Sequence, residues 1–361
     1  MDMNLLTGGQ MISNGGNVAN TLAANNYDLS SLRPYMEVPD GPSLVTRVAT
    51  HNVMTGESTY VVAPTVNAAT LTHQSWQQID SVVIDTAQKE LTVVADLEAR
   101  GLVYNLPNAL GKSVLISQMA SDVSDADLSM DARRQTAADR QEFDTSTLPL
   151  PIAHKDFHFG IRELNAVNTG EITLDTRMIR ESTKKVAAVI EQLALGTYGT
   201  YAFGGGNIYG LANHGDVNTK SQTTPTGANG PVVFVEILDM IAKAVIDNHR
   251  GPYVIYAAPS WEPFLDADYS NAKGEGSLRD RILKIGKVQD VLIADHMTTK
   301  TMLLVQTTND VVEIVNGIDF VTVEWDSLGG MEKNFKVMAM KVPRVRSDFD
   351  GQSGIVLGTY T

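Results

Sequence analysis

The chain contains no cysteine among its 361 residues. Disulfide bonds and thiolate metal sites both require cysteine, so both are excluded. No apolar run approaches the roughly 20 residues that a helix needs to cross a bilayer. Residues 1–6 also lack the basic region and the apolar core of a secretory signal peptide. We therefore expect a protein that stays in the cytoplasm of the cell that makes it.

Positive charge is scarce. The chain carries 28 lysines and arginines against 42 acidic residues, a formal net charge of −14. Such a chain repels phosphate overall, which disfavours tight or sequence-specific binding of nucleic acid. Local basic groups at Arg133-Arg134 and Arg344-Val345-Arg346 could still make weak contacts. Acidity is compatible with enclosing DNA without adhering to it.

Motifs typical of enzymes are missing. The chain has no G-x-S-x-G elbow, no H-E-x-x-H and no Cys–His pair. Gly111-Lys112-Ser113 resembles the end of a phosphate-binding loop, but that motif needs glycine where Leu106 stands. Gly204-Gly205-Gly206 is more simply a flexible connection than a phosphate cradle. We predict no catalytic residue, no cofactor and no enzyme; a small oligomeric enzyme is the rival class.

One alternating pattern suits a metal. His154, Asp156 and His158 would share one face of a strand, with Phe157 and Phe159 on the other face. The three polar side chains could hold a divalent ion. They could equally form the polar face of a half-buried strand. We favour the second interpretation and predict no metal site.

Two polar segments are poor in large apolar side chains, and a β-rich stretch lies between them. Residues 1–33 are rich in glycine, asparagine, serine and alanine, which predicts an arm that orders on a partner. Residues 43–50 and 58–66 are β-rich and predict a hairpin. Residues 111–147 are polar and too long for a loop inside a compact domain. We expect this last segment to project and pack on another subunit.

Spacing of three and four residues predicts three long helices. The first runs along an apolar stripe from Trp76 to Val94. The second, residues 174–195, begins near Thr173 or Asp175 and ends at Gly196. Its expected buried stripe is Ile179, Val186, Ile190 and Leu193, and its expected solvated face is Glu181, Lys184, Lys185 and Glu191.

The third helix opens at Gly230-Pro231, with proline in the favoured first turn. Its expected buried side is Phe234, Leu238, Ile241 and Val245. A buried strand at 253–258 and a short helix at 278–285 follow. The remainder is mostly β, with runs at 291–295, 302–306, 311–315, 320–325 and 335–342. Helices interleaved with several antiparallel strand signals predict an α+β fold.

Ordered motifs along the chain resemble the encapsulin shell proteins and their relatives among tailed-phage major capsid proteins. The likeness covers about four-fifths of the chain, from Gln74 to the end. It rests on Gln74–Asp80 (QSWQQID), Leu148–Phe157 (LPLPIAHKDF), Ile161–Gly170 (IRELNAVNTG), Lys185-Val186-Ala187, Tyr209-Gly210-Leu211 and Gly251-Pro252-Tyr253.

This resemblance implies the Hong Kong 97-type capsid fold. Its parts would be an N-terminal arm with a hairpin at 1–73, an N-terminal helix opening the peripheral domain at 74–110, an extended E-loop at 111–147, a peripheral domain with the long spine helix at 148–209, an axial domain at 210–315, and a return to the peripheral domain at 316–361. The tip of the axial domain would fall near 268–276.

The implied function is that of a structural protein. The chain would assemble with itself into pentamers and hexamers of an icosahedral phage head enclosing double-stranded DNA. Portal, scaffolding and decoration proteins are the implied partners, DNA contacts would be weak and non-specific, and no membrane is involved. The implied location is the virion, assembled in the host cytoplasm.

Two features of the resemblance leave alternatives. Encapsulins begin close to the QSWQQID helix, whereas about 70 residues precede it here, which favours a phage subunit over a nanocompartment shell. Some phage relatives cross-link an E-loop lysine to an asparagine of a neighbour. Lys112 is the only lysine between Lys89 and Lys155, so it is the sole candidate. An ordinary solvated lysine is the simpler interpretation.

Overall fold

The architecture comes from a computed structural model. The structure describes residues 36–37, 44–45, 48–51, 58–60, 71, 73–121, 130, 140–170, 174–226, 229–268, 276–327, 331–348 and 350–360. The predicted arm at 1–33 and most of the predicted axial tip lie outside these residues.

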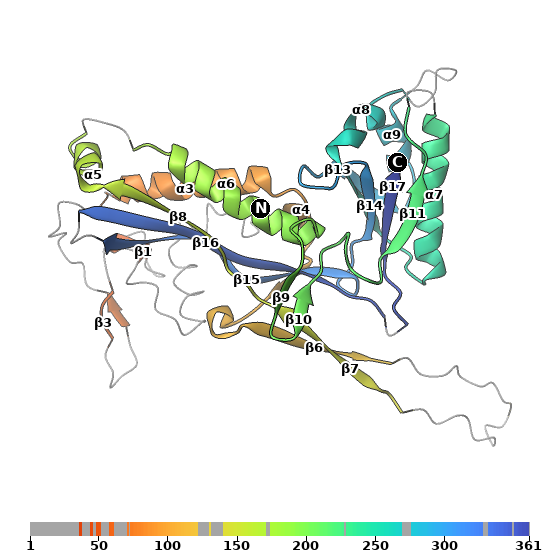
Figure 1. Ribbon diagram of the computed structural model, residues 1–361, viewed down its shortest axis with the longest axis horizontal. Coiled ribbons are helices and arrows are strands. Elements are labelled where there is room, and N and C mark those ends of the chain that lie inside the picture. The colour runs from red at the N-terminus through yellow and green to blue at the C-terminus, as the bar shows by residue number, and fades with distance from the viewer. Residues whose placement is uncertain are drawn as a thin grey trace.

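Strands outnumber helices in the described residues, and Figure 1 shows how they are arranged. The strands are β1 (Met36–Glu37), β2 (Leu44–Val45), β3 (Val48–His51), β4 (Ser58–Tyr60), β5 (Val103–Asn105), β6 (Val114–Ala120), β7 (Phe143–Pro149), β8 (Ala153–Gly160), β9 (Tyr201–Phe203), β10 (Gly206–Ile208), β11 (Asn218–Gln222), β12 (Tyr253–Ala257), β13 (Val288–Ile293), β14 (Thr301–Gln306), β15 (Val312–Ser327), β16 (Glu332–Val345) and β17 (Ile355–Tyr360). The helices are α3 (His73–Glu90), α4 (Val93–Ala99), α5 (Ile161–Asn168), α6 (Arg177–Leu195), α7 (Gly230–Ile246), α8 (Glu262–Leu265) and α9 (Leu278–Leu283).

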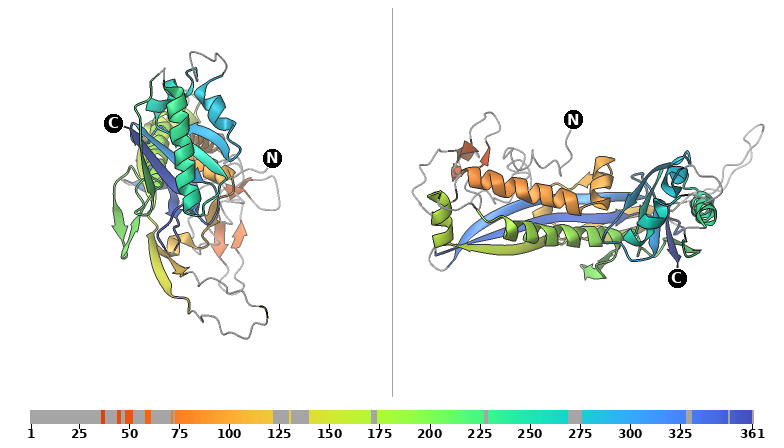
Figure 2. Two further views of the ribbon diagram at one scale, coloured as in Figure 1. Left: turned by 90° about the vertical axis from the view of Figure 1, so that its right-hand side faces the viewer. Right: turned by 90° about the horizontal axis from the view of Figure 1, so that it is seen from above.

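A four-stranded sheet forms the elongated half of the molecule. Its order is β5-β15-β16-β8, and β16 pairs antiparallel with both of its neighbours. Helices α3 and α6 lie side by side along one face of this sheet (Figure 2). Beneath them, the Phe335 ring stacks on Phe157 at 5.3 Å and meets Trp76 at 5.9 Å. The alternation of buried Phe157 and Phe159 with exposed His154, Asp156 and His158 on β8 is as predicted.

A five-stranded sheet forms the other half. Its order is β11-β17-β14-β12-β13, and α7 packs on β11 and β17. Two of its pairings, β11 with β17 and β12 with β13, are parallel. The sequence analysis noted antiparallel strand signals and did not predict these two parallel pairings, because crossovers bring distant segments into one sheet. The α+β class is confirmed.

Strand β17 is a second departure from the sequence analysis. Residues 316–361 were expected to return to the peripheral domain, but residues 355–360 lie inside the five-stranded sheet. The boundary expected at 315 also falls within β15, a single long strand where two short runs were expected. The rest of the expected division into domains stays a prediction.

The first expected helix is interrupted. It ends at Glu90, and α4 begins at Val93, three residues later. The backbone N–H groups of Thr92, Val93 and Val94 all donate to the carboxylate of Glu191 on α6. A side chain from another helix thus caps α4 and fixes the break.

Helix α6 ends where predicted, but it begins at Arg177, three residues after the expected start at 174. Asp175 Oδ1 accepts a hydrogen bond from the Arg177 N–H at 2.9 Å, and Gly196 ends the helix with a φ of +83°. The expected apolar stripe is buried. Glu191 was expected on the solvated face but is only 1% exposed, because its carboxylate is needed at the start of α4.

Helix α7 turns a different face inward from the one expected. Its fully buried side chains are Val233, Ile237, Met240 and Ala244. Leu238 was expected inside but is 39% exposed. The helix is apolar almost all round, so periodicity alone could not select the buried face. The outward stripe that results is Val232, Val235, Leu238 and Ile246.

Candidate assembly surfaces

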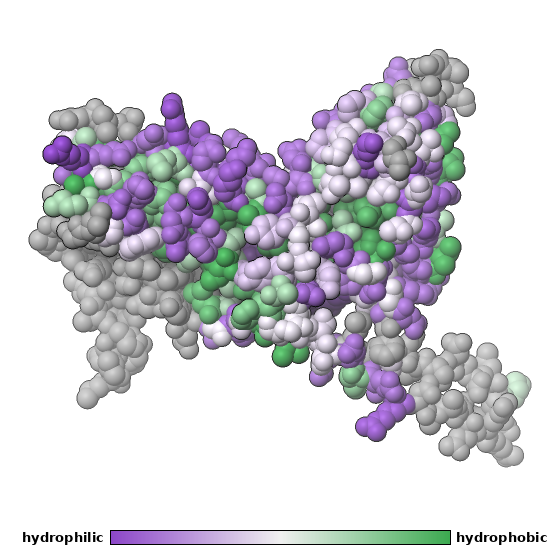
Figure 3. All heavy atoms as spheres, viewed as in Figure 1, coloured by the Kyte–Doolittle hydropathy of each residue, from purple (hydrophilic) through white to green (hydrophobic). Residues whose placement is uncertain are grey.

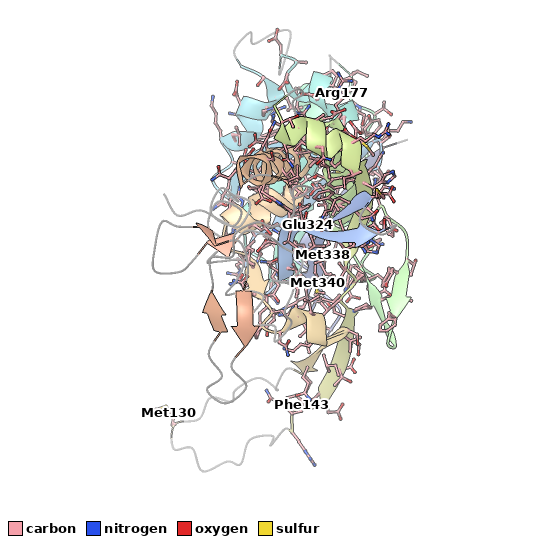
Figure 4. All side chains as sticks on the ribbon, turned by 90° about the vertical axis from the view of Figure 1, so that its left-hand side faces the viewer. Met130, Phe143, Arg177, Glu324, Met338 and Met340 are labelled. Carbon is pink, nitrogen blue, oxygen red and sulfur yellow. The ribbon has the colours of Figure 1, made fainter. Side chains whose placement is uncertain are left out.

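A long β-hairpin leaves the body of the molecule. Strands β6 and β7 pair antiparallel from Val114↔Pro149 at the base to Ala120↔Phe143 at the far end. Phe143 lies on the hairpin well away from Met338 and Met340 in the sheet (Figure 4). Phe143 is 65% exposed and Ile116 is 64% exposed. Strands β6 and β7 thus lie at the two ends of the predicted E-loop region, 111–147. Residues 122–129 and 131–139 of this region are outside the described part.

The base of this hairpin is packed firmly. Leu148 and Leu150 are buried with Met338 and Met340 in a second apolar cluster, on the sheet face away from α3. The β9–β10 hairpin also presses on β7: a Cβ at Gly206 would lie 2.0 Å from the carbonyl oxygen of Thr147. Glycine is required at this contact. The base is thus fixed by the core while the far end carries exposed apolar side chains.

An apolar groove lies close to that base. It runs between the end of α6, the start of β8 and the β9–β10 hairpin, and its aromatic walls stay exposed to solvent: Tyr198 49%, Tyr201 36% and Phe203 53%. Figure 3 shows exposed apolar surface in the lower middle of the molecule. The charged side chains that line the groove are all lysines, namely Lys155, Lys185 and Lys336.

The hairpin region has the opposite charge. Residues 111–147 contain seven acidic and four basic residues, a formal charge of −3. Acidic Glu142 and Asp144 flank Phe143, and both are exposed. An acidic segment with protruding apolar side chains and an aromatic groove with a lysine rim are complementary in chemistry.

Glu191 joins the helices behind the groove. Its carboxylate accepts from Val93 N at 2.6 Å, Val94 N at 3.2 Å and Thr92 N at 3.3 Å. Burial raises the pKa of Glu191 to about 7, although the three backbone hydrogen bonds oppose the shift. The hydrogen bonds that connect the spine helix α6 to helix α4 therefore depend on a carboxylate that can take up a proton.

Lys112, the sole candidate for a cross-linking lysine and more simply an ordinary solvated one, lies at the foot of the hairpin. Lys112 Nζ donates to the carbonyl oxygen of Pro107 at 2.9 Å, and the residue is exposed. Ser113 is followed by strand β6, whereas a phosphate-binding loop is followed by a helix. Gly204 and Gly205 form the turn between β9 and β10, with φ of +60° and +84°.

The polar side chains of β8 that were considered as a metal site, His154, Asp156 and His158, contact charged groups of the same chain. Asp156 lies 3.6 Å from Lys336 Nζ and 3.9 Å from His154 Nδ1, while His158 is 3.4 Å from Glu332. In the described part of the chain, no group of three metal-ligating side chains comes together.

Arg344 and Arg346, the basic pair expected to touch DNA, both contact the buried carboxylate of Glu313, Arg346 at 2.9 Å. The other basic pair, Arg133-Arg134, lies outside the described residues. None of the described helices is long and apolar enough to span a membrane.

Three solved structures share this architecture. A virus-like particle from Pyrococcus furiosus aligns with a TM-score of 0.56 and 15% identity, covering 78% of this chain and 98% of its own. The capsid of a native GTA particle aligns with a TM-score of 0.54 and 13% identity, and the alignment covers 75% of this chain and 91% of the other. The capsid of Myoviridae phage XM1 aligns with a TM-score of 0.53 and 12% identity, and the alignment covers 69% of this chain and 86% of the other. Identities this low show the fold alone, and they confirm the Hong Kong 97-type capsid fold that the sequence predicted.

Sequence comparison adds a family. No curated protein matches the chain. Residues 67–358, about four-fifths of the chain, match a family described only as a family of unknown function, DUF6260. The match begins just before α3 and extends into β17, so it spans both sheets, the spine helix and the projecting hairpin. The chain belongs to this family, DUF6260.

Proposed function

We propose that this protein is the major capsid protein of a tailed phage. Copies of the chain assemble into pentamers and hexamers, and these form an icosahedral head around double-stranded DNA. The fold supports the coarse part of this proposal, a shell subunit. The projecting hairpin supports self-association, because its exposed apolar side chains have no core of their own chain to enter.

The hairpin is the observation that carries the proposal. Each of its strands has seven residues, so the paired part reaches about 23 Å at roughly 3.3 Å per residue. Two-thirds of Phe143 and of Ile116 stays exposed there. Large apolar side chains on a projecting element are typical of a contact with another molecule. The aromatic groove with its lysine rim offers a matching surface on a second copy.

The finer points rest on charge and on sequence. A chain with a formal charge of −14 encloses DNA through weak, non-specific contacts, since it repels phosphate. Portal, scaffolding and decoration proteins complete the head that we propose. The chain itself turns over no substrate. A nanocompartment shell is the second candidate, and the residues that precede α3 favour the phage head over it.

The test is assembly of the purified full-length protein. Negative-stain microscopy and light scattering should show rings or closed shells. Phe143→Asp should abolish shells while circular dichroism stays as in the wild type, because the side chain is outside the core. Phe143→Tyr keeps an aromatic ring and should still assemble. A monodisperse monomer or dimer of the wild type in every salt and crowding condition would contradict the proposal.

The content of the particles separates the two candidates. Shells recovered from infected or producing cells should contain nuclease-protected double-stranded DNA if they are phage heads. Shells that hold a defined protein cargo and no DNA would identify a nanocompartment instead. Binding of DNA fragments to purified shells should fall steeply as salt rises.

A further inference from the structure

A lysine lies inside the core between two carboxylates. Lys341 is in β16, and its side chain is fully buried, with an exposed fraction of 0%. Its Nζ lies 2.6 Å from Glu98 Oε1 on α4 and 3.0 Å from Asp319 Oδ1 on β15. The side chains of Glu98 and Asp319 are 1% and 5% exposed. Three ionisable groups thus meet in a site from which solvent is almost excluded.

Irregular strand pairing brings the aspartate to the lysine. Lys341 pairs directly with Asn316 across the two strands, and the register then shifts between Asn316 and Ile318 and again between Ile318 and Val321. Asp319 lies within the second of these shifts. Such bulges redirect side chains and are often found next to reactive sites.

The charges of the three groups do not balance. Two carboxylates and one ammonium leave one excess negative charge in a low-dielectric environment, which favours uptake of a proton. Burial accordingly raises the pKa of Glu98 above its ordinary value, although Lys341 opposes the shift. Glu98 Oε2 has no hydrogen-bond partner among the described residues, so it has room for that proton. The Phe320 ring, 6.0 Å from Lys341 Nζ, closes one side.

We propose that Lys341 and Asp319 join through an amide bond within the chain, with Glu98 transferring the protons. The bond links β15 to β16 inside the four-stranded sheet. It involves neither Lys112 nor a neighbouring subunit, so it is independent of the proposed role in a shell.

The reaction balances without a co-reactant. Glu98, which carries the extra proton, gives it to a carboxylate oxygen of Asp319 and takes a replacement from the Lys341 ammonium across the 2.6 Å contact. The free amine attacks Cγ of Asp319, so that a C–N bond forms. Glu98 carries a second proton from nitrogen to the same oxygen, the C–O bond breaks and one water leaves. Glu98 ends in its starting state, and one ammonium and one carboxylate have become a neutral amide.

Proximity and burial favour this step over a lasting ion pair. Nitrogen and carboxylate are already at contact distance, which replaces an encounter by an intramolecular step. The buried ion pair carries a desolvation penalty that the neutral amide does not. Lys220 and Asp239 provide the contrast within the same chain. They are equally close, at 2.8 Å, but 27% and 52% exposed, so they have no such drive.

Intact mass of the purified full-length protein, measured after denaturation, is the direct test. The wild type should be lighter than its sequence by the mass of one water. A tryptic digest should contain one branched peptide that joins the segments around Asp319 and Lys341, with no cleavage after Lys341. Cleavage after Lys220 should be normal. A wild-type chain at full sequence mass with normal cleavage after Lys341 would overturn the proposal.

Three variants test the chemistry. Asp319→Asn should release ammonia in place of water and reach the same final mass as the wild-type product. Glu98→Gln cannot transfer protons and should keep its full sequence mass, while Lys341→Arg should also show no loss. The control Asp239→Asn should leave the water loss intact. Loss of water in Glu98→Gln would overturn the role of Glu98. The wild-type mass and digest decide the bond itself, even if a variant does not fold.

Discussion

The two sheets of this molecule differ in the kind of side chain that they bury. In the five-stranded sheet the central strands are apolar: all of Tyr253–Ala257 is fully buried, as is Met302–Val305. In the four-stranded sheet, β15 and β16 carry the charged side chains of Glu313, Asp319 and Lys341 to buried positions. One half relies on apolar burial, and the other adds paired charges inside its core.

This difference predicts where the molecule is sensitive. Removing a methyl group from an apolar core leaves a small cavity, and the loss is modest. Removing one partner of a buried ion pair leaves an uncompensated charge, and the loss is large. The half built on the four-stranded sheet should therefore respond strongly to single substitutions and to pH. The other half should respond weakly to both.

Lys341→Met should give the largest effect. It leaves Glu98 and Asp319 as buried carboxylates with neither the ammonium nor the proposed amide bond to compensate them, and we expect a loss of at least about 3–5 kcal/mol of unfolding free energy. Denaturant unfolding followed by circular dichroism would measure it. Lys336→Met is the matched control on the same strand, because that lysine is 30% exposed and should change stability by less than about 1 kcal/mol. Equal losses for the two variants would contradict the contrast.

A change of pH should act next through Glu191. Its pKa is raised to about 7 in the folded protein, while an ordinary glutamate ionises near 4.3. The folded state therefore holds this proton more tightly, and stability falls as pH rises from about 4.5 to 7 by on the order of 3 kcal/mol. Glu191→Gln should flatten this part of the profile.

Unfolding curves at several pH values would show the effect. Glu181→Gln alters an exposed glutamate of the same helix and should follow the wild-type profile. If Glu191→Gln kept the full pH dependence, the buried carboxylate would not be its source.

The smallest effect should come from the apolar sheet. Ile255→Val removes one buried methylene from β12, and we expect a loss of about 1 kcal/mol. The loss should be the same at pH 5 and pH 8, because no titratable group is involved. A strongly pH-dependent loss at this position would erase the distinction between the two sheets.

Local patterns in the sequence were enough for several elements. The spine helix α6 was predicted from its apolar stripe and its terminal Gly196, and the exposed and buried faces of β8 from strict alternation. The polar, overlong segment at 111–147 was predicted to project, and its described residues include strand β6 and most of strand β7. Its pairing as a hairpin was not predicted, because β7 (FDTSTLP) is mostly polar and carries no strand signal to match β6 (VLISQMA).

Other features depended on contacts distant in sequence. The sequence around Glu191 predicts a surface residue. The residue is buried because three N–H groups at the start of α4, almost one hundred residues earlier, donate to its carboxylate. Lys341 needs Glu98, 243 residues away. Strand β17 was missed because Gly358 weakens the strand signal. A Cβ at that position would lie 2.6 Å from Cδ of the Gln222 side chain, which would have to move.

The place of β17 has a consequence for synthesis of the protein. This strand, residues 355–360, lies between β11 and β14 and hydrogen-bonds to both. Until the ribosome has released those residues, β11 has no partner and the sheet is split. Closing it requires pairing across more than one hundred residues, which is slow compared with local folding. A truncated nascent chain would therefore lack a finished sheet, and the five-stranded half is complete only after translation has passed β17.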